Sequence, residues 1–181
     1  MNIRFAEQDA FGARETSTPG RFLAKPPRPL VLGLGNALLC DEGAGVQLTA
    51  RLKAERGGQD ADYVDGGLMS LSLFPLVEAA AALLVIHAAD LQREPGALTL
   101  FEGEEMDACL RRPRTRSVHE RGLIDLLEVA RVRGCLPQRR ALLCIQPKRV
   151  DWGEALSLPV FQALPRASCA VAQLLERWQP A

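Results

Sequence analysis

Short apolar runs alternate with amphipathic stretches along most of this chain. Mainly apolar residues occupy positions 30–34, 83–86 and 141–145, a pattern typical of strands buried on both faces. Positions 61–64 form a shorter run, and positions 98–101 alternate enough to predict an edge strand. Turn-forming or polar residues follow each of these runs, so we expect separate strands.

Two helices are predicted in the first half of the chain. The first covers about 42–56, because Gly57 and Gly58 follow it and glycine commonly ends helices. The second covers about 71–80 and is either started or kinked by Pro75. Each predicted helix lies between two predicted strands.

Two further helices are predicted in the second half. Residues 117–120, Ser-Val-His-Glu, have the form of a capping box, so a helix should begin there. The apolar residues of this helix share one face: Leu123, Leu126, Leu127 and Ala130. We expect Pro165 to open the last helix, in which Val171, Leu174, Leu175 and Trp178 share one face. Residues 102–116, acidic and then basic, are expected to form a connection.

Alternating strands and helices of this kind indicate an α/β fold with a mainly parallel sheet covered by helices on both faces. At 181 residues, with 48% of them hydrophobic, the chain can bury one core and is too short for two ordinary domains. Residues 1–28 combine prolines, a glycine and scattered charges without sustained apolar periodicity. We therefore expect a flexible N-terminal arm followed by a single domain at 29–181.

Charge and cysteine content exclude several classes of protein. The 22 basic residues balance the 22 acidic residues, so no overall field attracts nucleic acid or a membrane surface. No signal peptide or membrane-spanning run is present, and we expect neither membrane insertion nor nucleic-acid binding. Five scattered cysteines without a CxxC motif argue against a disulfide framework. We expect a cytoplasmic protein, and a monomer.

Three residues with metal-binding side chains are predicted at one edge of the sheet. Glu42 follows the first strand, Asp65 follows the second, and His119 lies at the start of a later helix. Because parallel strands end at the same edge, where open α/β proteins bind ligands, the two carboxylates should lie there and the imidazole can reach them. Two carboxylates and one imidazole suit a divalent ion with open coordination positions.

Other interpretations of these residues remain open. Glu42 could be only an acid in the first turn of a helix, favoured by the helix dipole, and His119 only a surface histidine. A nucleotide-binding turn is disfavoured because Leu38 stands where the fingerprint requires its third glycine. No GxSxG or HExxH motif is present. A cysteine–histidine pair stays an open alternative, although Cys40 and Cys144 lie in apolar runs, where a thiol is usually inert.

Several ordered motifs resemble those of the maturation endopeptidases of nickel–iron hydrogenases. The opening signature of that family resembles GLGNALLCDEGAGV at 33–46, and its second motif resembles VDGG at 64–67. Later motifs resemble DLQREPGAL at 90–98, SVHERGLIDLL at 117–127, RVRGCLP at 131–137 and LLCIQP at 142–147. The resemblance covers about 30–173, which is most of the chain.

The resemblance implies a three-layer α/β sandwich with a five-stranded sheet and a metal-binding set at Glu42, Asp65 and His119. Such an enzyme removes a C-terminal extension from the precursor of the hydrogenase large subunit, and the metal is nickel already held by that substrate. No organic cofactor is implied. The family usually has aspartate where His87 stands and often threonine where Leu68 stands, so His87 could be an extra ligand, a substrate contact or a neutral replacement.

Two other function classes compete with this endopeptidase. One is a binding protein that recognises the nickel-loaded precursor without cutting it, and the other is an α/β nucleotide-binding module. The sequence does not distinguish whether Glu42 or Asp65 acts as ligand or as general base, because either carboxylate suits both roles.

Overall fold

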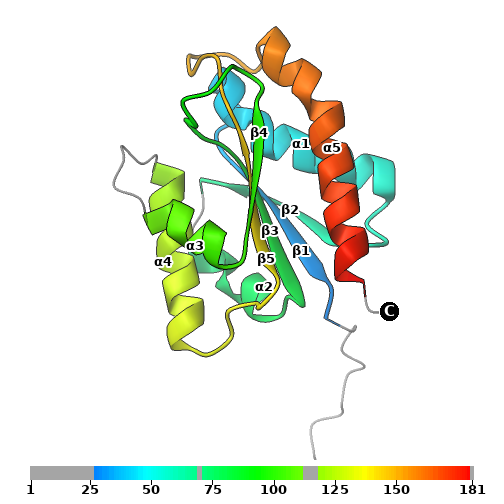
Figure 1. The fold of residues 1–181 in the computed structure, drawn as a ribbon, viewed down its shortest axis with the longest axis vertical. Helices are drawn as coiled ribbons and strands as arrows, with labels where there is room; N and C mark the ends of the chain where they lie inside the picture. Colours follow the sequence, from blue (N-terminus) through cyan, green and yellow to red (C-terminus); the bar gives the residue numbers. More distant parts are fainter. Residues whose placement is uncertain (1–26, 69–70, 112–117, 180–181) are drawn as a thin grey trace, which may run out of the picture.

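The computed structural model describes residues 27–68, 71–111 and 118–179, with the side chains of 118–120 outside the description. In these residues a five-stranded sheet has the order β2-β1-β3-β5-β4 (Figure 1). Four strands are parallel: β1 (Pro29–Leu34), β2 (Asp62–Gly67), β3 (Ala82–Ala88) and β5 (Arg140–Ile145). The edge strand β4 (Leu98–Glu102) is antiparallel to β5. The predicted α/β fold with a mainly parallel sheet is confirmed.

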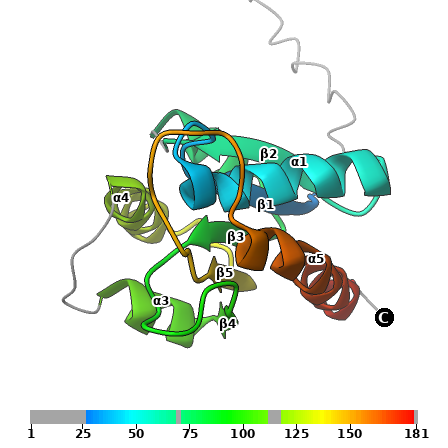
Figure 2. The same ribbon diagram turned by 90° about the horizontal axis from the view of Figure 1, so that it is seen from above.

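Helices cover both faces of this sheet (Figure 2). One face carries α1 (Ala44–Arg56) and α5 (Leu158–Trp178), and the other carries α2 (Phe74–Glu78), α3 (Glu104–Arg111) and α4 (Val118–Val132). Short 3-10 helices precede two of them, η1 (Cys40–Gly43) before α1 and η2 (Leu71–Leu73) before α2. The protein is therefore a three-layer sandwich, as predicted.

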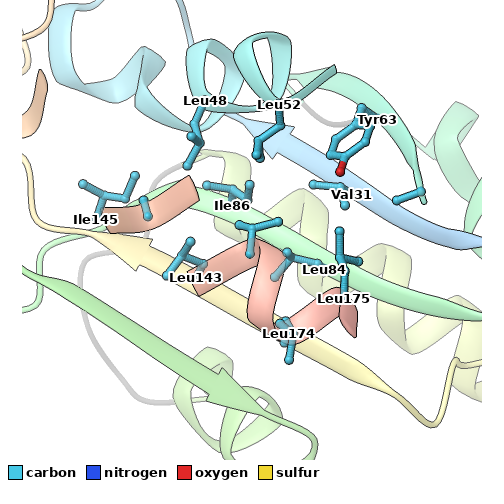
Figure 3. Packing of buried hydrophobic residues seen from close by; sticks show 14 of the residues in the cluster. Val31, Leu48, Leu52, Tyr63, Leu84, Ile86, Leu143, Ile145, Leu174 and Leu175 are labelled. Carbon is cyan, nitrogen blue, oxygen red and sulfur yellow. The ribbon is translucent and has the colours of Figure 1, made fainter. Parts of the chain in front are cut away.

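Alternate residues of the central strands belong to two separate hydrophobic cores, one on each face of the sheet. Val31 faces the core under α1 and α5, whereas Leu30 and Leu32 face the core under α2, α3 and α4. Figure 3 shows Leu48 of α1 and Leu174 of α5 in the same cluster as Leu84 of β3. Each such leucine contributes roughly 1.5–3 kcal/mol by leaving water. The continuous apolar strands in the sequence follow from this two-sided burial.

The last helix begins earlier than predicted. It starts at Leu158, directly after Ser157, and Pro165 lies inside it with an exposed side chain. Buried residues with helical spacing precede and follow this proline: Val160, Ala163, Leu164, Ala167 and Val171. The prediction that Pro165 opens the helix is wrong because burial of this apolar face outweighs one missing backbone hydrogen bond, and Pro159 occupies the first turn.

The predicted connection at 102–116 contains a helix that the sequence analysis missed. Met106, Cys109 and Leu110 are buried on one face of α3, at i, i+3 and i+4 spacing. Acidic residues in its first turn and Arg111 in its last complement the helix dipole. The periodic signal was present but spanned only eight residues between charged neighbours.

Several predicted boundaries move by a few residues. Strand β2 extends to Gly67 because Asp65 pairs with Gly33 of β1, so Asp65 lies within the strand and not after it. Likewise His87 lies within β3, opposite Cys144 of β5. The helix expected from Glu42 starts as η1, and α1 follows at Ala44.

The predictions for the remaining helices stand in part. Pro75 lies in the first turn of α2, so it starts this helix and does not kink it. The apolar face predicted for α4 is buried. The Ser117 end of its capping box lies outside the described residues.

Candidate functional site

The predicted site lies at the carboxyl ends of the parallel strands. β1 leads into η1, which holds Glu42, and Asp65 lies near the end of β2. These strands are neighbours in the sheet, with Gly33 opposite Asp65. Glu42, in the turn after β1, and Asp65, near the end of β2, therefore lie at the same edge of the sheet, where open α/β folds bind ligands.

A chain of glycine contacts joins the two carboxylate-bearing segments. Gly35 has φ +132°, and a Cβ there would lie 1.8 Å from the backbone oxygen of Glu42. The amide of Gly35 also donates to the carbonyl of Gly67 at 3.1 Å. Gly67 in turn donates its amide to Oδ1 of Asp65 at 2.8 Å. Only glycine allows the close approach at position 35, so this turn fixes the Glu42 backbone beside the end of β2.

Asp65 and Glu42 differ in their access to solvent. Asp65 is exposed, whereas Glu42 is half-buried in the 3-10 turn. One oxygen of Asp65 accepts the Gly67 amide, and a carboxylate has further acceptor positions for a substrate group or a metal. The pair thus presents one accessible and one partly enclosed carboxylate at the same edge.

The backbone of His119 lies at the same end of the molecule. It is the second residue of α4, and α4 ends at Val132, shortly before β5 begins at Arg140. A helix that returns to the start of a parallel strand begins at the other end, where the strands finish, and Figure 1 shows this direction. α4 also packs against η2 and α2, which follow β2.

The side chain of His119 lies outside the described part of the chain, so the geometry of the predicted metal set rests on two of its three members. Among side chains that the structure describes, no three His, Cys, Asp or Glu residues form a group that could hold a metal. The assignment of Glu42, Asp65 and His119 as ligands stays a prediction.

His87 is a buried histidine at this edge, with 2% of its surface exposed. Its neighbour Ile86 pairs with Gly33, so His87 lies level with the end of β1. It belongs to a central strand and is flanked by β1 and β5. This location keeps His87 close to the site without showing a ligand role.

Asp41, beside Glu42, is a residue whose role the sequence analysis missed. Its side chain is fully buried and accepts four hydrogen bonds. The amides of Lys148 and Arg149 donate to Oδ2 at 2.8 and 3.0 Å, the amide of Ser157 donates to Oδ1 at 2.6 Å, and the Ser157 hydroxyl donates to Oδ2 at 2.8 Å. Asp41 thereby ties the turn that carries Glu42 to the segment between β5 and α5.

These hydrogen bonds also set the ionisation of Asp41. Burial by itself raises the pKa of a carboxyl group, but the bonds from Ser157, Arg149 and Lys148 outweigh burial and leave the pKa of Asp41 below its ordinary value of 3.8. Asp41 is thus a structural anion at neutral pH. The position of Asp41 beside Glu42 drew attention to this turn. The hydrogen-bond partners of Asp41 could not be predicted, because they lie more than 100 residues away in the sequence.

A second charged cluster lies at α3 and serves to hold elements together. Asp107 accepts hydrogen bonds from Arg140 at 2.8 and 3.1 Å and from Arg131 at 3.0 Å. Burial by itself raises the pKa of Asp107, but the guanidinium groups have the larger combined effect. The pKa of Asp107 is therefore below its ordinary value, and the side chain is ionised at neutral pH. Because its carboxylate is engaged by two arginines that join α3 to β5 and α4, this cluster does not compete as a catalytic site.

A family profile and individual proteins that resemble this chain agree on one family. The profile of the family described as Hydrogenase maturation protease (HycI) matches residues 46–174. The chain is 34% identical over 157 residues to the hydrogenase expression/formation protein HupD of Rhodobacter capsulatus, covering 85% of this chain and 74% of that protein.

Two solved structures share the fold. The hydrogenase maturating endopeptidase HybD from Escherichia coli superposes with a TM-score of 0.75 and 26% identity, over 83% of this chain and 93% of that one. The NiFe hydrogenase maturation protease HybD from Thermococcus kodakarensis gives a TM-score of 0.71 and 28% identity, over 82% and 99%.

Proposed function

Since the chain belongs to the hydrogenase maturation protease family, we propose that it removes the C-terminal extension from a nickel–iron hydrogenase large-subunit precursor that already carries nickel. The chain is a maturation endopeptidase, and this proposal specifies its substrate and its site. One structural observation carries the assignment of the site. Glu42, in the turn after β1, and Asp65, near the end of β2, are linked through Gly35 and Gly67 at the carboxyl edge of the sheet.

Glu42, Asp65 and His119 would bind the nickel of the substrate. A mixed set of carboxylates and an imidazole suits a borderline divalent ion and leaves positions for the ligands that the substrate itself supplies. Hydrolysis of a peptide requires a polarised carbonyl and an activated water, and a divalent ion supplies both. The protein's own contribution is to hold these side chains at a fixed edge of a rigid sheet.

If one of the two carboxylates does not ligate the nickel, that carboxylate would serve as general base. Glu42 is the more enclosed residue, and Asp65 is the more accessible one. Proton transfer to a positioned carboxylate contributes about 10²- to 10⁴-fold to a rate. His87 is not required in this proposal, because the three residues named above form a complete set for a substrate metal that brings its own ligands.

We further propose that the protein acts as a monomer in the cytoplasm on this one protein partner and uses no organic cofactor. Among the described helices, none is long and apolar enough to cross a membrane. All five cysteines are free thiols, which fits a reducing compartment.

The test is cleavage of a purified precursor, followed by the mass of its large subunit. The intact enzyme should shorten nickel-loaded precursor at its C-terminus and leave nickel-free precursor intact, and added zinc should not restore cutting. The variants Glu42→Gln, Asp65→Asn and His119→Ala should each lose most activity. A second substitution should add little, because residues that act together are not additive.

The matched controls are His87→Asp, which should retain most activity, and Glu78→Gln, an exposed acid on α2. Efficient cutting of nickel-free precursor, or near-normal rates with Glu42→Gln, would contradict this mechanism. Binding of loaded precursor without any mass loss would instead indicate a checkpoint protein. Tight binding of ATP or NAD by calorimetry would indicate a nucleotide-binding module.

A further inference from the structure

Large apolar side chains are exposed on the loops beside Glu42. Leu38, in the turn between β1 and η1, is 50% exposed, and Trp152, between β5 and α5, is 82% exposed. Val150 in the same segment as Trp152 is 52% exposed. A tryptophan is rarely left in water to this extent without a partner, because its burial removes about 150–250 Å² of largely apolar surface from solvent.

The two loops are joined by backbone contacts, so Leu38 and Trp152 belong to one surface. The amide of Gly153 donates to the carbonyl of Leu38 at 2.9 Å, and the amide of Cys40 donates to the carbonyl of Gly153 at 2.6 Å. Leu39 and Gly153 form an isolated parallel bridge. We refer to Leu38, Val150 and Trp152 as the docking surface.

The docking surface is also held in a fixed position relative to Glu42. Asp41 carries the four hydrogen bonds that hold both ends of the segment with Trp152, at Lys148 and Arg149 before it and at Ser157 after it. Glu42 is the next residue after Asp41. A group bound on the docking surface is therefore positioned by the same carboxylate that fixes the turn of Glu42.

We propose that the docking surface binds an apolar segment of the large-subunit precursor next to the scissile bond. This inference rests on the proposed function, which supplies a protein substrate. Backbone bonds join the docking surface to the turn that carries Glu42, so a chain bound at this turn can also contact the docking surface. Its rim contains both signs of charge, in Lys148, Arg149, Asp151 and Glu154. An apolar centre with such a rim is typical of protein interfaces and does not select an acidic or basic partner.

The size of the docking surface favours a transient substrate over a second copy of the chain. A stable protein interface buries roughly 800 Å² on each partner, more than three side chains provide. A maturation protease has to release its product, and one aromatic anchor with two aliphatic neighbours suits a contact that dissociates.

Fluorine NMR can test the contact because the chain has only two tryptophans. Enzyme labelled with 5-fluorotryptophan should give two signals, and Trp152→Phe assigns one of them. On addition of unlabelled nickel-loaded precursor, the Trp152 signal should shift or broaden. The signal of Trp178, which is 8% exposed in the core, should stay unchanged and report an intact fold.

Kinetics with the same precursor provide the second readout. Trp152→Ala should raise KM by about tenfold to thirtyfold, the loss expected when an aromatic anchor is truncated, and Trp152→Phe should recover part of it. The matched control is Val132→Ala, at the opposite end of the molecule, where Val132 is 87% exposed. Its KM should equal that of the wild type.

The outcomes separate this inference from the proposed function. Cleavage with an unmoved Trp152 signal and an unchanged KM in Trp152→Ala would overturn the docking surface and leave the protease assignment standing. A shifted Trp152 signal without cleavage by the wild type would support the docking surface and contradict the proposed reaction.

Discussion

Two neighbouring carboxylates in η1 have different environments. Asp41 is fully buried and accepts four hydrogen bonds, whereas Glu42 is half-buried and lies on the side of the candidate site. A buried carboxylate is costly unless it is hydrogen-bonded, and Asp41 meets that condition. Its ionised form therefore stabilises the turn that carries Glu42.

Asp41→Asn should destabilise the protein by about 2–4 kcal/mol at neutral pH, since the amide replaces one acceptor oxygen with a donor facing an N–H group. Because the folded pKa of Asp41 is below 3.8, its contribution is fully present above that value and is lost as the pH falls through the folded pKa. The difference between wild type and variant should thus be constant near neutrality and shrink below pH 3.8.

Denaturant unfolding at several pH values measures this difference. Asp151→Asn, an exposed aspartate in the segment that Asp41 anchors, is the control and should change stability by no more than about 0.5 kcal/mol. An Asp41→Asn variant as stable as the wild type at pH 7 would show that the four hydrogen bonds do not hold this segment.

Helix α1 approaches the sheet closely at its first turn. A Cβ at Gly45 would lie 2.3 Å from the backbone oxygen of Ile86 and 2.5 Å from that of Leu34. Both neighbours are backbone atoms of central strands, so neither can rotate away. The absence of a side chain at Gly45 therefore sets the distance between α1 and the strands, and with it the position of η1 and Glu42.

Gly45→Ala should cost about 2–3 kcal/mol, because α1 must move away from the sheet. The matched control lies at the other end of this helix, where Gly57 has φ +61° and a Cβ would meet nothing within 4 Å. Gly57→Ala should cost only about 1 kcal/mol for the left-handed conformation. Thermal melts distinguish the two variants, and equal losses would show that space at Gly45 does not position α1.

At the scale of the whole molecule, Arg28 joins three segments of the described chain. The Arg28 side chain donates to Oδ1 of Asp62 at 2.9 Å and to the carbonyl of Gly58 at 2.6 Å, and its own carbonyl accepts the amide of Ala81 at 3.0 Å. Arg28 thus connects the beginning of β1 to the segments before β2 and β3. We propose that the domain spans 29–181 and that Arg28, the residue directly before it, anchors the start of β1.

A chain that starts at Arg28 should fold and keep its activity. Its melting temperature should fall by less than about 5 °C, which for a domain of this size corresponds to roughly 1–2 kcal/mol. A further Arg28→Ala change in the shortened chain should lower the melting temperature again. An insoluble shortened chain, or a larger fall, would show that residues 1–27 contribute to the folded domain.

Local sequence patterns are sufficient for the class of fold and for the edge of the sheet at which the site is predicted. Apolar runs such as 83–86 are local patterns, and burial on both faces dictates them wherever the strand lies in the sheet. Because parallel strands end at one edge, Glu42 and Asp65 could be placed near each other without knowing the order of the strands. His119 was predicted in the same way, from its position at the start of a later helix, and its part in the site stays a prediction.

Contacts between residues far apart in the chain could not be predicted from local patterns. Asp41 and Ser157 are 116 residues apart, and no local pattern in either segment indicates their hydrogen bonds. Pro165 favours a helix start by local preference, yet packing of the α5 face against the sheet carries the helix through it. Likewise, pairing with Gly33 extends β2 past Asp65. In each case the contact energy comes from a partner brought close by folding, and it outweighs the local preference.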